Sequence, residues 1–154
     1  MYSLRTILCG TDFSRESECA VEVAGALARD HGARLIVLHV LPPPVPGKVP
    51  VYLEDRDQVM EDLRALRPPD PDVVEEHLTA AGSPAERILA AAAQTRANLI
   101  VLGTHGRTGL RRMILGSVAE QVVRRAACPV LTVKGASEPA VAASKTKTAA
   151  SASS

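Results

Sequence analysis

The chain has 154 residues, 46% of them apolar and only 2% aromatic, and a formal net charge of +1. This length suits a single domain with an aliphatic core, and no apolar stretch reaches the ~18 residues that a membrane span needs. The near-neutral charge gives no reason to expect nucleic-acid binding, and three cysteines, an odd number, argue against a disulfide framework. Because the N-terminal apolar run is too short for a secretory signal, we expect a protein of the reducing cytoplasm without membrane contact.

Apolar runs at residues 6–10 (TILCG) and 34–41 (RLIVLHVL) predict two buried strands. Between them, an apolar stripe with i, i+3, i+4 spacing predicts an amphipathic helix that Ser14 caps and Gly32 ends in the left-handed conformation. A proline-rich loop follows, and then a predicted helix over residues 51–67. The second strand is apolar along its length rather than alternating, which indicates a parallel sheet covered on both faces.

The second half of the chain continues the alternation of strands and helices. Its strands are predicted at residues 73–79 (a weak edge strand), 98–103 (NLIVLG) and 128–134 (CPVLTVK). Each of the last two helices is predicted to begin with a capping box, formed by Ser83 with Glu86 and by Ser117 with Glu120. The pattern predicts an α/β fold with a parallel sheet and right-handed crossovers.

The sequence divides into a predicted α/β domain, residues 1–135, and a tail, residues 136–154. The tail consists mainly of Ala, Ser, Thr and Lys, so we expect it to be disordered. Within the domain, residues 52–76 hold nine acidic and three basic side chains, whereas residues 96–134 hold seven basic and one acidic. The basic half suits a local anion site rather than a broad nucleic-acid surface.

The glycine-rich segment, residues 103–117 (GTHGRTGLRRMILGS), connects a predicted strand to a predicted helix. Helix N-termini offer free N–H groups and a positive dipole end to phosphate, and Gly106 and Gly116 would let the backbone approach phosphate oxygens closely. Asp12, after the first strand, could accept hydrogen bonds from ribose hydroxyls or a base amino group. Both connections follow strand ends, where open α/β sheets bind ligands.

Other chemistries lack their sequence signatures. The chain has no G-x-x-x-x-G-K-[ST], no G-x-G-x-x-G after the first strand, and neither C-x-x-C nor H-E-x-x-H. A triad of Asp12, His105 and Ser117 would lack the G-x-S-x-G elbow that exposes a nucleophilic serine.

The chain resembles the universal stress protein family over roughly residues 4–134. The family motif G-x2-G-x9-G-S is present as Gly103, Gly106, Gly116 and Ser117, and TDFS, LHV, SPAE and CPVLTV are also similar. One departure is Gly10, where many members have proline or another residue, and we expect it to loosen the first turn without removing a ligand group.

The resemblance implies an open five-stranded parallel sheet in the order 3-2-1-4-5 with helices on both faces, the adenine nucleotide alpha hydrolase-like fold. It implies ATP as the ligand, with Mg²⁺ or Mn²⁺ bridging its phosphates, and a homodimer through the edge strand from Pro129 to Val133. Asp12 would contact the ribose and Val40 the adenine. The implied nucleotide site comprises Thr11, Asp12, Val40, Gly103, Gly106, Arg107, Gly116, Ser117 and Val118.

Structural alternatives remain open for most of these residues. Asp12 could bond its own turn, Gly103 could simply end a strand, and Ser117 could cap a helix. Outside the motif, Arg107 could be solvated, His105 positional and His39 a core histidine. At the level of function, we expect an ATP-dependent binding module in the stress response; a slow ATPase or phosphotransferase and a nucleotide-free structural dimer are the alternatives.

Overall fold

The computed structural model describes residues 2–41, 43, 46–47, 56–66, 70–105 and 115–135. The predicted tail and residues 106–114 of the glycine-rich segment lie outside these ranges. The elements are, in chain order, β1 (Thr6–Thr11), α1 (Arg15–His31), β2 (Arg34–Leu41), α2 (Arg56–Ala65), β3 (Glu75–Ala81), α3 (Pro84–Thr95), β4 (Leu99–Gly103), α4 (Ser117–Arg125) and β5 (Val130–Val133). The predicted alternation is confirmed, and β2 has its predicted bounds.

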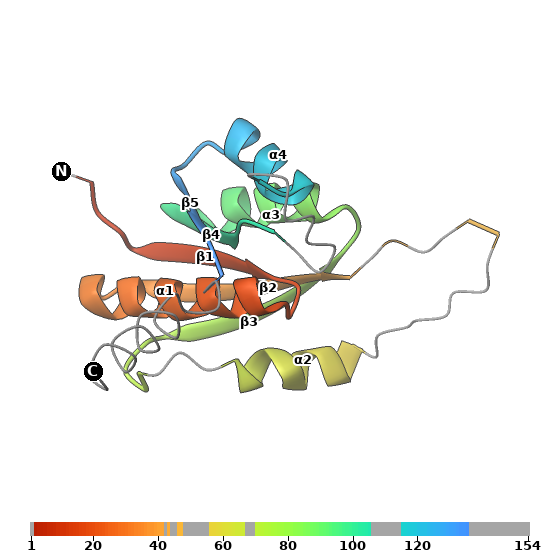
Figure 1. Ribbon diagram of the computed structural model, residues 1–154. Coiled ribbons are helices and arrows are strands. Elements are labelled where there is room, and N and C mark those ends of the chain that lie inside the picture. The colour runs from red at the N-terminus through yellow and green to blue at the C-terminus, as the bar shows by residue number, and fades with distance from the viewer. Residues whose placement is uncertain are drawn as a thin grey trace, which may run out of the picture.

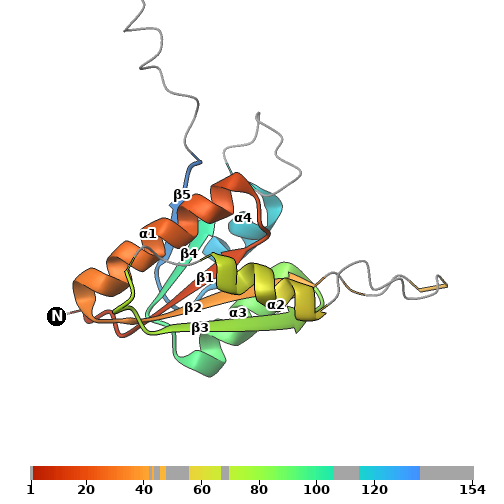
Figure 2. The same cartoon turned by 90° about the horizontal axis from the view of Figure 1, so that it is seen from below.

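The strands form one parallel sheet in the order β3-β2-β1-β4-β5, as the family resemblance implied. Figure 2 shows the five strands twisting in this order behind α1 and α2. At the centre, Cys9 of β1 lies beside Val37 of β2 on one side and Val101 of β4 on the other. Successive strands are therefore added on one side of β1 (β2, β3) and then on the other (β4, β5), and the strand order reverses between β1 and β4.

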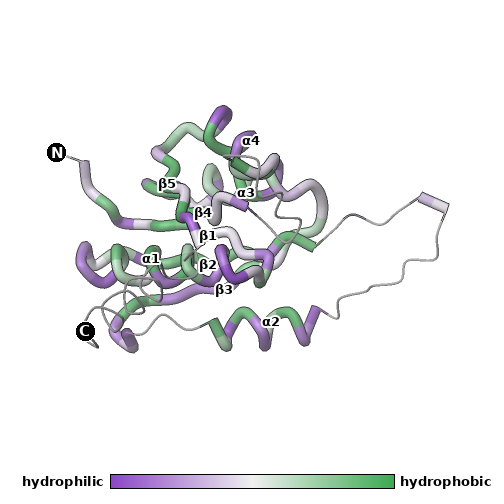
Figure 3. Tube along the Cα trace, in the orientation of Figure 1, coloured by the Kyte–Doolittle hydropathy of each residue, from purple (hydrophilic) through white to green (hydrophobic). Residues whose placement is uncertain are grey.

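Helices cover both faces of the sheet, with α1 and α2 on one side and α3 and α4 on the other (Figure 1). Alternate strand residues enter two aliphatic cores; Ile7 and Val37 face α1 and α2, whereas Leu8 and Ile36 face α3 and α4. Green and purple segments alternate around the outer helices in Figure 3, because each helix has one apolar and one solvated side. Strands buried on both faces explain why β1, β2 and β4 are apolar along their length.

Both ends of α1 form as predicted. The Ser14 hydroxyl accepts a hydrogen bond from the Ser17 N–H at 3.3 Å, and Gly32 follows the helix with φ of 61°. Cys9 lies in the core beneath this helix, and burial raises the pKa of its thiol to about 12. Cys9 is therefore a packing residue rather than a nucleophile.

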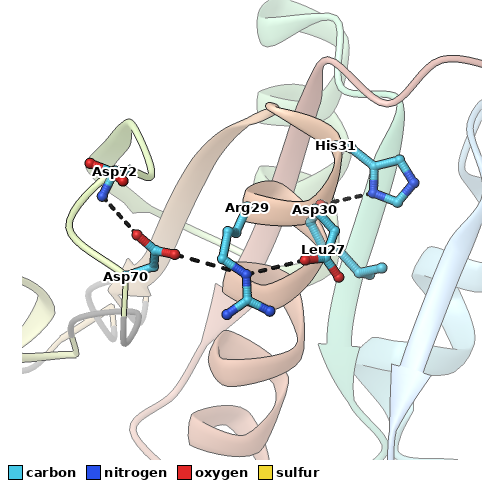
Figure 4. A network of polar contacts seen from close by, with 6 residues as sticks. All are labelled: Leu27, Arg29, Asp30, His31, Asp70 and Asp72. Carbon is cyan, nitrogen blue, oxygen red and sulfur yellow. Dashed lines mark hydrogen bonds and ion pairs between the residues drawn. The ribbon is translucent and has the colours of Figure 1, made fainter.

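The C-terminal end of α1 carries a group of polar contacts at the amino-terminal edge of the sheet (Figure 4). Arg29 Nε lies 3.1 Å from Asp30 Oδ1 and 3.8 Å from Asp70 Oδ2, while His31 Nδ1 lies 2.9 Å from the Leu27 carbonyl oxygen. Arg29 and Asp30 are exposed, so these ion pairs contribute little to stability.

Neither predicted capping box forms. Ser83 precedes α3 but makes no side-chain cap hydrogen bond, and the N-cap of α4 is Gly116 rather than Ser117. Because α4 begins one residue earlier than predicted, Ser117 is its first helical residue and cannot be its N-cap. The glutamates of both predicted boxes pair with arginines of α4, Glu86 with Arg125 at 3.0 Å and Glu120 with Arg124 at 2.6 Å.

Candidate functional site

A cavity of about 260 Å³ lies where β1 and β4 end, at the point where the strand order reverses. Open α/β sheets bind ligands at this position because the loops on either side diverge and leave a crevice. The cavity lining includes all the predicted site residues that the structure describes, namely Thr11, Asp12, Val40, Gly103, Gly116, Ser117 and Val118. Gly106 and Arg107, also predicted, lie outside the described residues.

One end of the cavity is apolar. Leu38 and Val40 of β2, Ile88 of α3 and Leu102 of β4 line it together with Gly10. Gly10 lies within β1 rather than in the turn that follows. A Cβ at Gly10 would lie 2.7 Å from Leu102 Cδ2 and 3.3 Å from Ile88 Cδ1, and the glycine therefore allows these side chains to pack against β1.

The turn between β1 and α1 forms the side of the cavity through a chain of short-range hydrogen bonds. The Asp12 Oδ1 atom accepts from the Ser14 N–H at 3.0 Å, and the Thr11 hydroxyl accepts from the Phe13 N–H at 3.1 Å. The Thr11 and Ser17 hydroxyls lie 3.0 Å apart. Asp12 is thus a turn residue that also lines the cavity, so the turn interpretation and the ligand interpretation are compatible.

Phe13 has a left-handed backbone conformation, with φ of 61°, which costs about 1–3 kcal/mol for a residue other than glycine. Its ring contacts the buried His39, with ring centroids 4.7 Å apart. His39 Nδ1 in turn lies 2.8 Å from the Thr11 carbonyl oxygen. These contacts hold the turn, and they agree with the interpretation of His39 as a core histidine.

The opposite side of the cavity is the first turn of α4, where Ser117, Val118 and Ala119 line it. N–H groups in the first turn of a helix have no intrahelical acceptor and can bind an anion. The Gly116 N–H is not one of these groups, because it donates to the Thr104 carbonyl oxygen at 2.6 Å. Gly116 has φ of −69°, which any residue adopts, so its backbone conformation does not require glycine.

Gly103, the first motif glycine, lines the cavity but also lies against α1. A Cβ there would be 3.2 Å from the backbone carbon of Glu16 and the backbone nitrogen of Ser17. Close approach of the helix is therefore a reason for this glycine that the sequence pattern did not reveal. Two further lining residues, Ser17 and Thr104, are buried and polar and were also missed, because single hydroxyls carry no recognisable sequence signal.

The residues that the structure describes contain no group of three or more His, Cys, Asp or Glu side chains placed to hold a metal ion. Within the same ranges, no helix has the length and apolar character needed to cross a lipid bilayer.

A doubly wound parallel sheet with a cavity at its switch point defines a class of ligand-binding α/β proteins. Within this class, the sequence profile of the universal stress protein family matches residues 3–134, and the chain belongs to that family. The Thermus aquaticus protein called universal stress protein in QAH/OAS sulfhydrylase 3'region is 38% identical over 136 residues, which cover 84% of this chain and 98% of the relative.

Solved structures agree with the fold. Universal stress protein UspA from Lactobacillus plantarum superposes with a TM-score of 0.73 at 24% identity, covering 85% of this chain and 98% of the other. A universal stress protein solved in complex with cAMP has a TM-score of 0.64 at 26% identity, covering 87% and 99% of the two chains.

Proposed function

We propose that this protein binds ATP in the cavity between β1 and β4 and acts as a nucleotide-dependent regulator in the stress response. The observation that carries this proposal is the convergence of the predicted site residues on one cavity of about 260 Å³. The relative solved with cAMP supports an adenine nucleotide as the class of ligand.

The cavity suits the three parts of an adenine nucleotide in sequence. The apolar end formed by Leu38, Ile88 and Leu102 accepts a base, with the Val40 backbone at its margin. The Asp12 carboxylate, also in the lining, would accept a hydrogen bond from a ribose hydroxyl, and the N–H groups in the first turn of α4 would bind phosphates. Mg²⁺ or Mn²⁺ would enter with ATP, coordinated mainly by phosphate oxygens and water.

Slow hydrolysis is the second candidate function, and the position of His105 favours it. His105 lines the cavity, and its Nδ1 atom lies 3.1 Å from the Thr104 hydroxyl and 3.5 Å from a Glu16 carboxylate oxygen. A histidine held in this way could act as a base, whereas the other candidate, Asp12, is committed to its turn and the ribose. With so few candidate bases, we expect hydrolysis to be slow, each event taking on the order of minutes or longer, whereas typical enzymes turn over about 10 times per second.

We also propose that the protein is a homodimer through the strand from Pro129 to Val133. β5 lies at an edge of the sheet, and Leu131 is 37% exposed there. Apolar sheet edges are normally paired or covered, and a second copy of the same strand would satisfy this one.

The direct test is to identify nucleotide released from purified, heat-denatured protein by mass spectrometry and to measure ATP binding by calorimetry. Gly116→Val should weaken ATP binding at least ten-fold, because its side chain would occupy the space beside the phosphates and displace hydrogen bonds of about 1.5–3 kcal/mol each. Adenosine, without phosphates, should bind both proteins alike.

Arg111→Ala is the control, since it removes positive charge from the glycine-rich segment without adding a side chain. Circular dichroism first establishes that each variant is folded. If folded Gly116→Val binds ATP as tightly as the wild type, the assignment of the phosphate site is wrong.

A further inference from the structure

Glu16, in the first turn of α1, makes contacts that its sequence position does not suggest. Its Oε2 atom accepts a hydrogen bond from the His105 N–H at 2.7 Å and another from the Thr104 hydroxyl at 3.1 Å. Both partners lie at the start of the glycine-rich segment, 88 and 89 positions further along the chain. A carboxylate that accepts two such bonds holds a backbone position more firmly than a neutral group would.

Thr104 also bonds the far end of the glycine-rich segment. Its carbonyl oxygen accepts from the Gly116 N–H at 2.6 Å, immediately before α4. Thr104 is only 4% exposed, whereas the Glu16 side chain is 31% exposed, so the bonds are shielded from water on the Thr104 side. Glu16 therefore holds Thr104, the residue at which the two ends of the glycine-rich segment meet.

Two glycines make room for Glu16. A Cβ at Gly103 would lie 3.2 Å from the Glu16 Cβ, and a Cβ at Gly135 would lie 2.5 Å from the Glu16 Cγ. Gly103 ends β4 and Gly135 follows β5, so two separate parts of the chain leave space for the Glu16 side chain.

We propose that Glu16 is a positioning residue for the phosphate end of the nucleotide site, holding Thr104 and His105 in place and, through the Thr104 carbonyl oxygen, Gly116 at the start of α4. This inference rests on the proposed ATP site and extends it to a residue outside the family motif. Residues that are fixed before binding lose less conformational entropy when phosphates bind. Because the residues that Glu16 holds lead to the first turn of α4, the effect should fall on the phosphates and not on the base.

The test compares ATP with adenosine in matched variants of the full chain. Glu16→Ala should weaken ATP binding by about ten-fold while changing adenosine binding less than about two-fold, since it removes a charge-assisted anchor from one end of the site only. Glu16→Gln, which keeps an acceptor oxygen, should recover part of the loss. Glu18→Ala is the control, because Glu18 is an exposed acid in the same helical turn.

Hydrogen exchange of the His105 amide supplies a readout that does not depend on nucleotide. Exchange should quicken in unliganded Glu16→Ala, recover in Glu16→Gln and stay unchanged in Glu18→Ala. If Glu16→Ala does not fold, ATP and adenosine binding are compared in Glu16→Gln and Thr104→Val instead. Each of these variants should weaken ATP binding more than adenosine binding, by a smaller factor than expected for Glu16→Ala.

Equal weakening of ATP and adenosine, or a loss in Glu18→Ala as large as in Glu16→Ala, would overturn the positioning role. If the wild type binds ATP and Glu16→Ala binds it equally well, the inference fails while the proposed function stands. If the wild type binds neither ligand, the proposed function fails, and His105 amide exchange then decides by itself whether Glu16 anchors the segment.

Discussion

At the scale of single residues, Gly10 lies in the apolar end of the cavity without room for a side chain. The side chains of Leu102 and Ile88 pack where a side chain of Gly10 would project. Gly10→Ala should therefore lower stability by about 1–3 kcal/mol through overpacking, and it should weaken adenosine binding by pushing Leu102 into the cavity. Urea unfolding and calorimetry with adenosine measure the two effects.

Leu102→Ala provides the matched comparison for this prediction. It opens space beside residue 10, so the double variant should lose less stability than the sum of the single losses. Strict additivity of the two changes would show that the residues do not compete for the same space.

At the scale of elements, α1 and α3 end in the same left-handed conformation with different residues. Gly32 follows α1 with φ of 61°, and Arg96 follows α3 with φ of 53°. Only glycine adopts this conformation without a steric penalty from Cβ. The two helix ends therefore form a natural pair for measuring that penalty within one protein.

Gly32→Ala should destabilise the protein and Arg96→Gly should stabilise it, each by about 0.5–1 kcal/mol. A Cβ at Gly32 would meet no atom within 4 Å, so its effect comes from the backbone alone. Urea midpoints at an unchanged m-value measure both differences. A stabilised Gly32→Ala protein would contradict the conformation described for the end of α1.

At the scale of the whole molecule, the proposed dimer depends on one edge of the sheet. Leu131→Lys should place a charge in the paired edge and raise the dimer dissociation constant at least ten-fold in sedimentation experiments, because an unpaired charge would be buried. Val74→Lys is the control, since Val74 is 67% exposed next to the opposite edge strand, β3. A wild-type protein that sediments as a monomer at micromolar concentration would contradict the dimer.

Much of the fold could be predicted because its signals are local or periodic. The apolar run of β2 gave its bounds directly, and the Ser14 and Gly32 ends of α1 follow from hydrogen bonds and backbone angles within a few residues. The strand order came from the family resemblance rather than from any pattern. The position of two connections at strand ends predicted which loops would meet, and the described residues of the predicted site line one cavity.

Sequence by itself determined the elements, the aliphatic core and the strand ends at which a ligand would bind, because propensity and periodicity act between near neighbours. Tertiary structure decided which partner each side chain found. Glu86 pairs with Arg125 of another helix instead of closing a capping box, and Glu16 reaches Thr104 across 88 positions of sequence. Such contacts depend on how the elements pack in three dimensions, which no local pattern specifies.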